Sequence, residues 1–244
     1  MTATKYYCEE MTAVPYACMA KGLSATLPSW LAKAIAGWLR LRRLARWNLR
    51  TSYGMAETVH ARAIERHEVH PEAAAMWAPM FEQLHDLQFR VLQYRLPKLI
   101  GLREQLNCIL LHESGQSLAT LEWQKLAPGS VPESFATLEF NSYPSDDPEV
   151  LTAAINPEHL IFSDAFKLPF VDAQFLSNQQ PLRKIFSDHQ KRTANRSTMP
   201  VDPSQALTAH LEHSDRRFAW LLQTGLLRPL SHHEIARCTA MKSD

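Results

Sequence analysis

The stretch from Ser29 to Arg50 constrains this chain most, because its apolar and basic residues repeat with the period of an α-helix. At 3.6 residues per turn, one arc collects Trp30, Leu31, Ala34, Ile35, Trp38, Leu41, Ala45 and Leu49. The opposite arc collects Lys33, Arg40, Arg43, Arg46 and Arg50, with Arg42 at the border and Leu39 and Trp47 as interruptions. This pattern predicts an amphipathic helix.

The ends of this helix are marked by local signals. Ser29 follows Pro28 and is a suitable N-cap. The helix is expected to end near residues 52–54, where Gly54 can adopt the left-handed capping conformation.

Charge is distributed unevenly along the chain, although the formal net charge is only +1. Between Met11 and Ala56 there are seven Lys or Arg residues and no Asp or Glu. From Leu126 to Phe166 there is no Lys or Arg, but seven acidic residues occur: Glu133, Glu139, Asp146, Asp147, Glu149, Glu158 and Asp164. The basic stretch indicates an anionic partner, or the basic and acidic stretches face each other within the fold.

The composition is that of a folded protein in a reducing compartment. The 244 residues suit one large domain or two small ones, and 45% hydrophobic with 21% charged residues excludes general disorder. Four scattered cysteines contain no C-x-x-C pair, which excludes a zinc ribbon or a thioredoxin-type site and fits the cytoplasm. No apolar run reaches the ~18–20 residues that span a bilayer, and the N-terminus does not resemble a secretory signal.

The periodicity along the chain predicts an α+β fold. Its three parts are a helical N-terminal half, a small and mostly antiparallel sheet in the middle, and a helical C-terminal segment. Helices are expected over 29–50, 56–69, 71–96 (kinked or restarted at Pro79), 149–155, 182–195, 203–224 and 231–241. Strands are expected near Tyr6 and over 107–112, 118–123, 135–140 and 159–162, the second and third forming a hairpin. The corresponding regions are 1–105, 106–196 and 197–244, with a linker at 197–203, or all of them form one domain.

The basic helix is the candidate binding site. Several arginines that approach together can hold phosphates, and a tryptophan among them can stack on a base. The predicted nucleic-acid-binding residues are Lys33, Arg40, Arg42, Arg43, Arg46, Trp47 and Arg50. The same pattern suits an anionic membrane surface, or a scaffold helix whose arginines pair with the acidic middle segment.

Eleven histidines raise the possibility of metal or acid–base chemistry. Glu57, His60 and His67 would share one face of the helix predicted over 56–69, with His70 nearby, and His210 and His213 lie three residues apart. The spacing of His67 and His70 is not that of the H-E-x-x-H zinc proteases, so we expect no metal, cofactor or assigned catalytic residue. His112, His189 and His210 are candidates for a general acid or base.

These observations favour a non-catalytic subunit of a larger assembly, such as a ribonucleoprotein, that binds the backbone of RNA or single-stranded DNA. One alternative is a histidine-dependent nuclease or metal hydrolase. The other is an interaction or membrane-surface protein that uses the basic amphipathic helix. The expected partners are nucleic acid and other protein subunits, with contact to a membrane surface left open.

Overall fold

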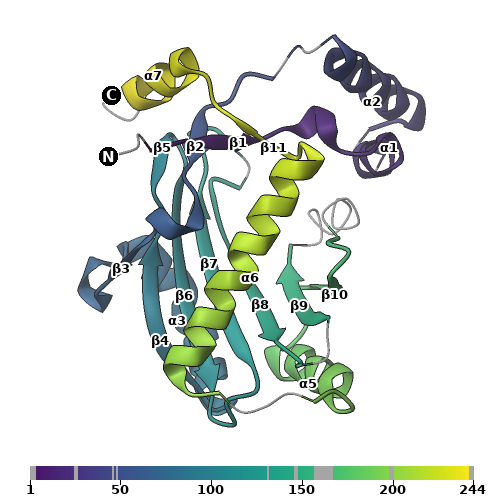
Figure 1. Ribbon diagram of the computed structural model, residues 1–244. Coiled ribbons are helices and arrows are strands. Elements are labelled where there is room, and N and C mark those ends of the chain that lie inside the picture. Colours follow the sequence, from purple (N-terminus) through teal and green to yellow (C-terminus); the bar gives the residue numbers. More distant parts are fainter. Residues whose placement is uncertain are drawn as a thin grey trace.

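The computed structural model describes residues 4–24, 27–45, 47, 49–130, 132–145, 148–156, 167–197 and 201–241. In this part of the chain, a seven-stranded and a four-stranded sheet combine with six α-helices (Figure 1). The helices are α1 (Tyr16–Leu23), α2 (Ser29–Leu44), α3 (Pro71–Asp86), α5 (Leu182–Thr193), α6 (Pro203–Thr224) and α7 (His232–Met241). Three short 3₁₀ turns are η1 (Met11–Ala13), η2 (Thr58–His60) and η3 (Arg66–Glu68).

The larger sheet has the strand order β10-β9-β8-β7-β6-β4-β3. Its strands are β3 (Arg62–Ile64), β4 (Phe89–Leu96), β6 (Glu104–His112), β7 (Leu118–Lys125), β8 (Ser134–Ser142), β9 (Glu149–Ile155) and β10 (Val171–Ser177). All neighbouring strands are antiparallel except β9 and β10, which are parallel.

Helices cover both faces of this sheet. On β6, Cys108 and Leu110 pack with α3 and α5, whereas Ile109 and Leu111 pack with α6. This alternation follows from the two-residue period of a strand. Figure 1 shows α6 running across one face, with α3 behind the sheet.

The smaller sheet has the antiparallel order β11-β1-β2-β5. Its strands are β1 (Tyr7–Glu9), β2 (Tyr53–Met55), β5 (Leu99–Gly101) and β11 (Leu227–Pro229). Helix α7 packs on β2 and β5, and the ring of Tyr7 meets Phe218 of α6 edge-on, with the ring centres 5.2 Å apart. Helix α6 therefore contacts both sheets.

The predicted helical N-terminal half and small sheet are wrong, because five strands lie within residues 1–105 and the larger sheet has seven strands. Where a helix was predicted over 56–69, the chain forms η2, β3 and η3. Strand β3 pairs antiparallel with β4 at the edge of the larger sheet. A strand partner supplied from elsewhere in the chain overrides the local helical preference of these Glu- and Arg-rich residues.

The helix that begins at Pro71 is shorter than the periodicity predicted. It continues through Pro79, ends at Asp86 and is followed by β4. Gln88, at the junction, has a φ of 63°, the left-handed conformation that usually requires glycine. Because a glutamine makes this turn, the sequence carries no recognisable stop signal there.

Residues 149–155 form the strand β9 and not the predicted helix. This strand lies between β8 and β10, and six of its seven residues are buried. A strand covered on both faces lacks the polar–apolar alternation by which a strand is recognised. Strand β10 was not predicted, and the strand predicted over 159–162 lies outside the described residues.

Local signals elsewhere are confirmed. Strands β6 and β7 form the predicted hairpin, and β8 contains the predicted strand. The Asp202 carboxylate caps α6 by accepting hydrogen bonds from the N–H groups of Ser204 and Gln205, and Gly225 ends the helix with a φ of 75°. Ser231 and Glu234 form the predicted capping box at the start of α7.

Candidate functional site

Helix α2 lies at one end of the molecule beside α1 (Figure 1). Ala32 and Ala36 are its buried residues, and Ala36 packs with Met19 and Ala20 of α1 in one apolar cluster. Small side chains allow the two helices to approach closely. Helix α2 is therefore held by small buried residues together with the half-buried Leu39.

Four large apolar side chains of α2 face solvent, whereas Leu31, Ile35 and Leu39 are half-buried. The exposed fraction is 72% for Trp30, 50% for Trp38, 64% for Leu41 and 73% for Leu44. We call these four residues the outer stripe. Successive residues of a helix are 100° apart, so burial of Ala32 and Ala36 directs the outer stripe outward. Trp30, Trp38 and Leu41 belong to the apolar arc that a scaffold helix would turn toward the core, and here they are exposed.

The helix is also shorter than predicted. It ends at Leu44, and Pro28 occupies the N-cap position without a side-chain hydrogen bond, so Ser29 is not the cap. Gly54 belongs to β2 and does not adopt the left-handed conformation. A Cβ atom there would lie 2.5 Å from Cδ1 of Leu230, so Gly54 serves close packing in the smaller sheet.

The seven predicted binding residues divide into groups. Lys33 and Arg40 are exposed and have no hydrogen-bond or ion-pair partner among the described residues. The Arg43 guanidinium donates a 2.9 Å hydrogen bond to the carbonyl oxygen of Ala13 and so helps to hold α2 in place. Arg42 lies over the Trp38 ring at 4.8 Å, and its Nε atom donates a 3.2 Å hydrogen bond to the carbonyl of Trp47.

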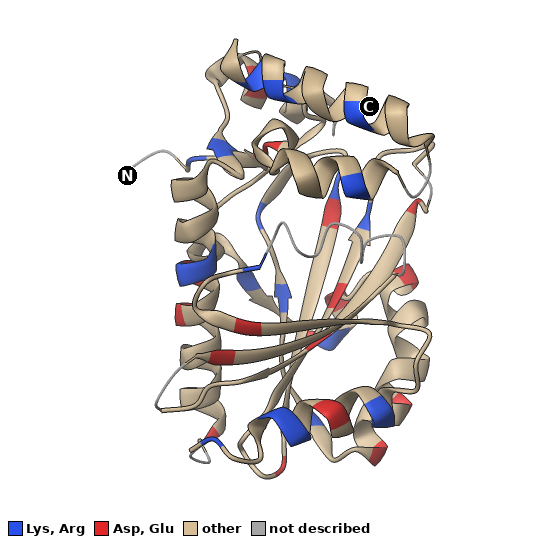
Figure 2. Cartoon of the chain, turned by 90° about the vertical axis from the view of Figure 1, so that its right-hand side faces the viewer, with Lys and Arg blue, Asp and Glu red and all other residues tan. Residues whose placement is uncertain are grey.

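The other three predicted residues follow the helix. Trp47 is 67% exposed, and Arg50 is exposed as well. Arg46 lies outside the described residues. In Figure 2, with α1 and α2 turned toward the viewer, several Lys and Arg residues lie at this end of the molecule.

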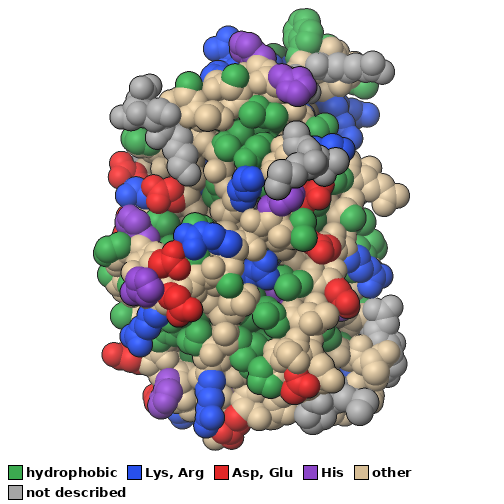
Figure 3. All heavy atoms as spheres, turned by 60° about the vertical axis from the view of Figure 1, so that its left-hand side comes forward, with side chains coloured by type: hydrophobic (Ala, Val, Ile, Leu, Met, Phe, Trp, Pro, Cys, Tyr) green, Lys and Arg blue, Asp and Glu red, His purple; other side chains and the backbone are tan. Residues whose placement is uncertain are grey.

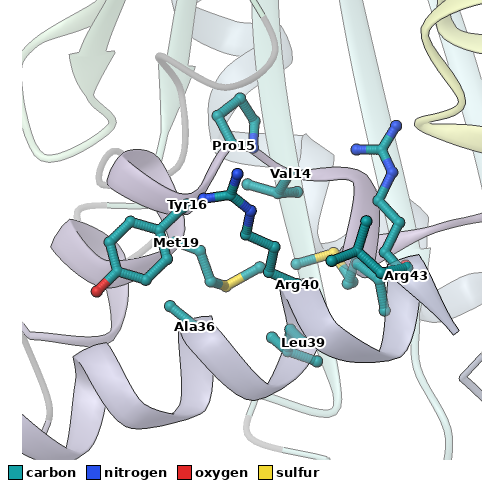
Figure 4. A pocket seen from close by; sticks show the side chains of 11 residues that line it. Val14, Pro15, Tyr16, Met19, Ala36, Leu39, Arg40 and Arg43 are labelled. Atoms are coloured by element: carbon teal, nitrogen blue, oxygen red, sulfur yellow. The ribbon is translucent and has the colours of Figure 1, made fainter.

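A pocket of about 440 Å³ lies between α1 and α2 (Figure 4). Its apolar lining includes Val14, Met19 and Leu39, and the side chains of Arg40 and Arg43 extend beside it. Leu44 belongs both to this pocket and to the outer stripe. The exposed apolar surface and the basic pocket are therefore contiguous.

Two carboxylates of the acidic middle segment form ion pairs with an arginine outside α2. Within this segment, Glu139 and Glu149 pair with Arg217 of α6. Asp172, just beyond it, pairs with Arg192 and Arg196. The arginines that neutralise carboxylates within the fold therefore lie on α5, just after α5 and on α6. The charge pattern of the sequence alone did not identify them.

The predicted histidine clusters do not form a metal site in the part of the chain that the structure describes. His60 and His67 lie on separate 3₁₀ turns, so they do not share a helix face with Glu57. Glu57 instead accepts a 2.9 Å hydrogen bond from the Tyr7 hydroxyl. His213 stacks on Tyr143, with the ring centres 4.3 Å apart.

The three candidate acid–base histidines have structural contacts. His189 is fully buried and lies 3.0 Å from the hydroxyls of both Ser142 and Thr152; burial and then the charge of Arg192 lower its pKa to about 3. His210 contacts the Tyr143 hydroxyl at 3.1 Å, and burial lowers its pKa to about 4. Burial also lowers the pKa of His112, whose Nδ1 contacts Ser114. All three side chains are therefore neutral near pH 7.

The face turned forward in Figure 3 differs from α2. Lys and Arg, Asp and Glu, and His side chains lie intermixed there with hydrophobic ones. On α2, in contrast, large exposed apolar side chains and basic side chains occur without acidic ones.

Comparisons with protein-family models, with curated proteins and with solved structures find no match to this chain. Among the described residues, no helix has both the length and the apolar character needed to cross a bilayer.

Proposed function

We propose that this protein binds the surface of an anionic membrane through α2, which would lie in the plane of the interface. The observation that carries this proposal is the outward direction of the outer stripe. Eight large hydrophobic side chains are exposed among the described residues, and six of them lie between Tyr16 and Trp47. Interfacial helices insert such a Trp- and Leu-containing face between the headgroups and the acyl chains.

The charges beside the outer stripe support an anionic surface. Lys33 and Arg40 project from one flank of the stripe and Arg42 from the other. Each basic residue close to an anionic leaflet contributes about 1 kcal/mol of binding free energy. Since no acidic residue occurs between Met11 and Ala56, nothing in this part of the sequence opposes that attraction.

Binding of nucleic acid stays a prediction, and the geometry favours it less. Phosphates would engage Lys33, Arg40 and Arg50, and Trp47 is exposed enough to stack on a base. A nucleic-acid backbone, however, offers no apolar phase to Leu41 and Leu44. A bilayer surface accommodates both the cations and the leucines.

Vesicle co-sedimentation tests the proposal. We expect binding to vesicles of phosphatidylcholine mixed with phosphatidylglycerol, weaker binding to phosphatidylcholine alone, and a decrease with added salt because salt screens exposed charges. Tryptophan emission should shift to the blue on binding. Absence of binding to the anionic vesicles at low salt would overturn the proposal.

Two double variants separate the apolar from the charged contribution. Trp30→Gln/Leu41→Gln should weaken binding by more than about tenfold, since the variant loses roughly 2–3 kcal/mol of apolar burial in the membrane. The matched control, Val59→Gln/Val91→Gln, changes two exposed apolar residues on other elements, η2 and β4, and should bind normally. Equal effects of the two variants would contradict a specific role of the outer stripe.

Lys33→Gln/Arg40→Gln should weaken binding by about tenfold or more and reduce its salt dependence. Its control, Arg183→Gln/Lys184→Gln, removes the same charge from exposed positions on α5. A fluorescence-anisotropy titration with single-stranded RNA completes the test. Tight RNA binding without vesicle binding would favour the nucleic-acid function instead.

A further inference from the structure

A second cavity lies on a different part of the molecule and is larger than the α1–α2 pocket, with a volume of about 740 Å³. It is bounded by η3 and the start of α3, by the turn between β4 and β5, by the start of β6, and by β7. A volume of this size is typical of sites for small organic molecules, about 300–1,000 Å³. All of its lining residues are described by the structure.

The interior of the cavity is apolar and partly aromatic. Leu106 and Trp123 are buried and lie opposite each other in the register of β6 and β7. The His70 ring stacks on Trp123, with ring centres 5.1 Å apart and planes 17° apart. Pro97 adds a further flat apolar side chain to the lining. These surfaces suit a planar ring.

Two buried N–H groups in the lining have no acceptor among the described residues: Nε1 of Trp123 and Nε of Arg103. A buried donor without a partner costs about 1–3 kcal/mol. His70 adds a third donor. Its Nδ1 accepts a hydrogen bond from the backbone N–H of Glu72, so the neutral ring carries its proton on Nε2. The two buried N–H groups are closed to solvent, so the Nε2–H of the half-buried His70 is the donor left for the acceptor atoms of a ligand.

The charges in the lining also favour an anion. Lys98 donates only to the Thr4 hydroxyl, at 3.0 Å, and has no acidic partner among the described residues. The Glu68 carboxylate is occupied by Arg62, at 2.8 Å, and by the N–H of Glu65.

The remaining two charged residues lie near groups of opposite charge. Glu104 lies opposite Lys125 in the register of β6 and β7, although the Lys125 ammonium forms its ion pair with Glu72, at 3.0 Å. The Arg103 guanidinium lies over the Tyr53 ring and 3.5 Å from Glu9. Lys98 is therefore the cation left to attract a ligand.

We propose that this cavity binds a small aromatic anion, whose ring packs beside the His70 ring that stacks on Trp123 and whose acidic group is bound by Lys98 and the Nε2–H of His70. The site is separate from α2 and does not depend on membrane binding.

Calorimetric titrations of the full chain with indole-3-acetate, with phenyl phosphate and with the neutral indole-3-acetamide test this proposal. We expect saturable binding of at least one anion and at least tenfold weaker binding of the amide. The two anions distinguish a carboxylate from a phosphate ligand. Absence of saturable anion binding, or equal affinity for the acetate and the amide, would overturn the proposal.

Two variants locate the binding. Lys98→Gln, at an exposed position, should weaken binding of the anion about tenfold and leave binding of the amide unchanged. Lys184→Gln is its control. Unchanged anion affinity in Lys98→Gln would place the ligand elsewhere and overturn the assignment.

Discussion

Arg217 of α6 forms an ion pair with Glu149 of β9, whose side chain is fully removed from solvent. The same guanidinium lies 3.3 Å from the carboxylate of Glu139 and donates a 3.0 Å hydrogen bond to Asn141. Burial alone would raise the pKa of Glu149, but His213 and Arg217 together lower it. Burial alone would lower the pKa of Arg217, but the carboxylates of Glu139 and Glu149 raise it above its ordinary value. This cluster ties α6 to the larger sheet.

The first prediction concerns the loss of the buried carboxylate. Glu149→Gln should lower the free energy of unfolding by about 3 kcal/mol, because it leaves part of the Arg217 charge uncompensated in a buried position. The effect should be at the lower end of the range for buried pairs, since Glu139 remains. Urea unfolding measures it, with Glu82→Gln at an exposed position of α3 as the control. Equal midpoints for the two variants would contradict a stabilising role of the pair.

The second prediction concerns pH. The pKa values of His189 and His210 fall from the ordinary 6.5 to about 3 and about 4. Below about pH 6.5 the unfolded chain therefore binds protons that the folded protein does not. Their contribution to stability is complete above pH 6.5 and is lost as the pH falls toward the folded-state values. The free energy of unfolding should decrease by on the order of 2 kcal/mol per pH unit between these limits.

Chemical denaturation at a series of pH values measures this slope. His189→Gln and His210→Gln should each make it shallower, whatever they do to stability at neutral pH. His85→Gln, at an exposed position of α3, is the control and should leave the slope unchanged. An unaltered slope in both buried-histidine variants would assign the acid sensitivity to other groups.

The third prediction compares two glycines with positive φ. Gly101 has a φ of 90°, and a Cβ atom there would lie 2.1 Å from the carbonyl oxygen of Ser52. Gly101→Ala should cost about 3 kcal/mol or more, from backbone strain and this contact together. Gly129 has a φ of 82° but open space around it, so Gly129→Ala should cost only about 1–2 kcal/mol. Thermal unfolding of the two variants should show this order, and the reverse order would contradict the close approach of β2 and β5.

The fourth prediction separates two arginines of α2. Arg43→Gln should lower stability by about 1–2 kcal/mol, because the hydrogen bond to the Ala13 carbonyl is lost. Arg40→Gln should change stability by less than about 0.5 kcal/mol, as is usual at exposed positions. Urea unfolding and vesicle binding are measured on the same samples. A stability loss in Arg40→Gln equal to that in Arg43→Gln would mean that Arg40 also supports the fold.

The parts of the fold that could be predicted have signals within a few residues of one another. Asp202 and Gly225 delimit α6, and Ser231 with Glu234 begins α7, because a cap is made by hydrogen bonds between near neighbours in sequence. The β6–β7 hairpin was visible for the same reason, since its two strands flank a short turn. Strand β9 could not be predicted in this way, because the helices that cover it and the strand β10 beside it come from other parts of the chain.

The candidate site likewise has a part set by neighbouring residues in the sequence and a part set by contacts between distant segments. The sequence by itself determined that α2 is a helix with an apolar arc, a basic arc and no acidic residue. It could not determine which arc faces water, because the partner of α2 is another element. Only the tertiary structure decided that the small residues Ala32 and Ala36 are buried and that Ala36 packs on α1, where a small side chain allows the two helices to approach closely. That contact turns Trp30 and Leu41 outward and commits Arg43 to the carbonyl of Ala13.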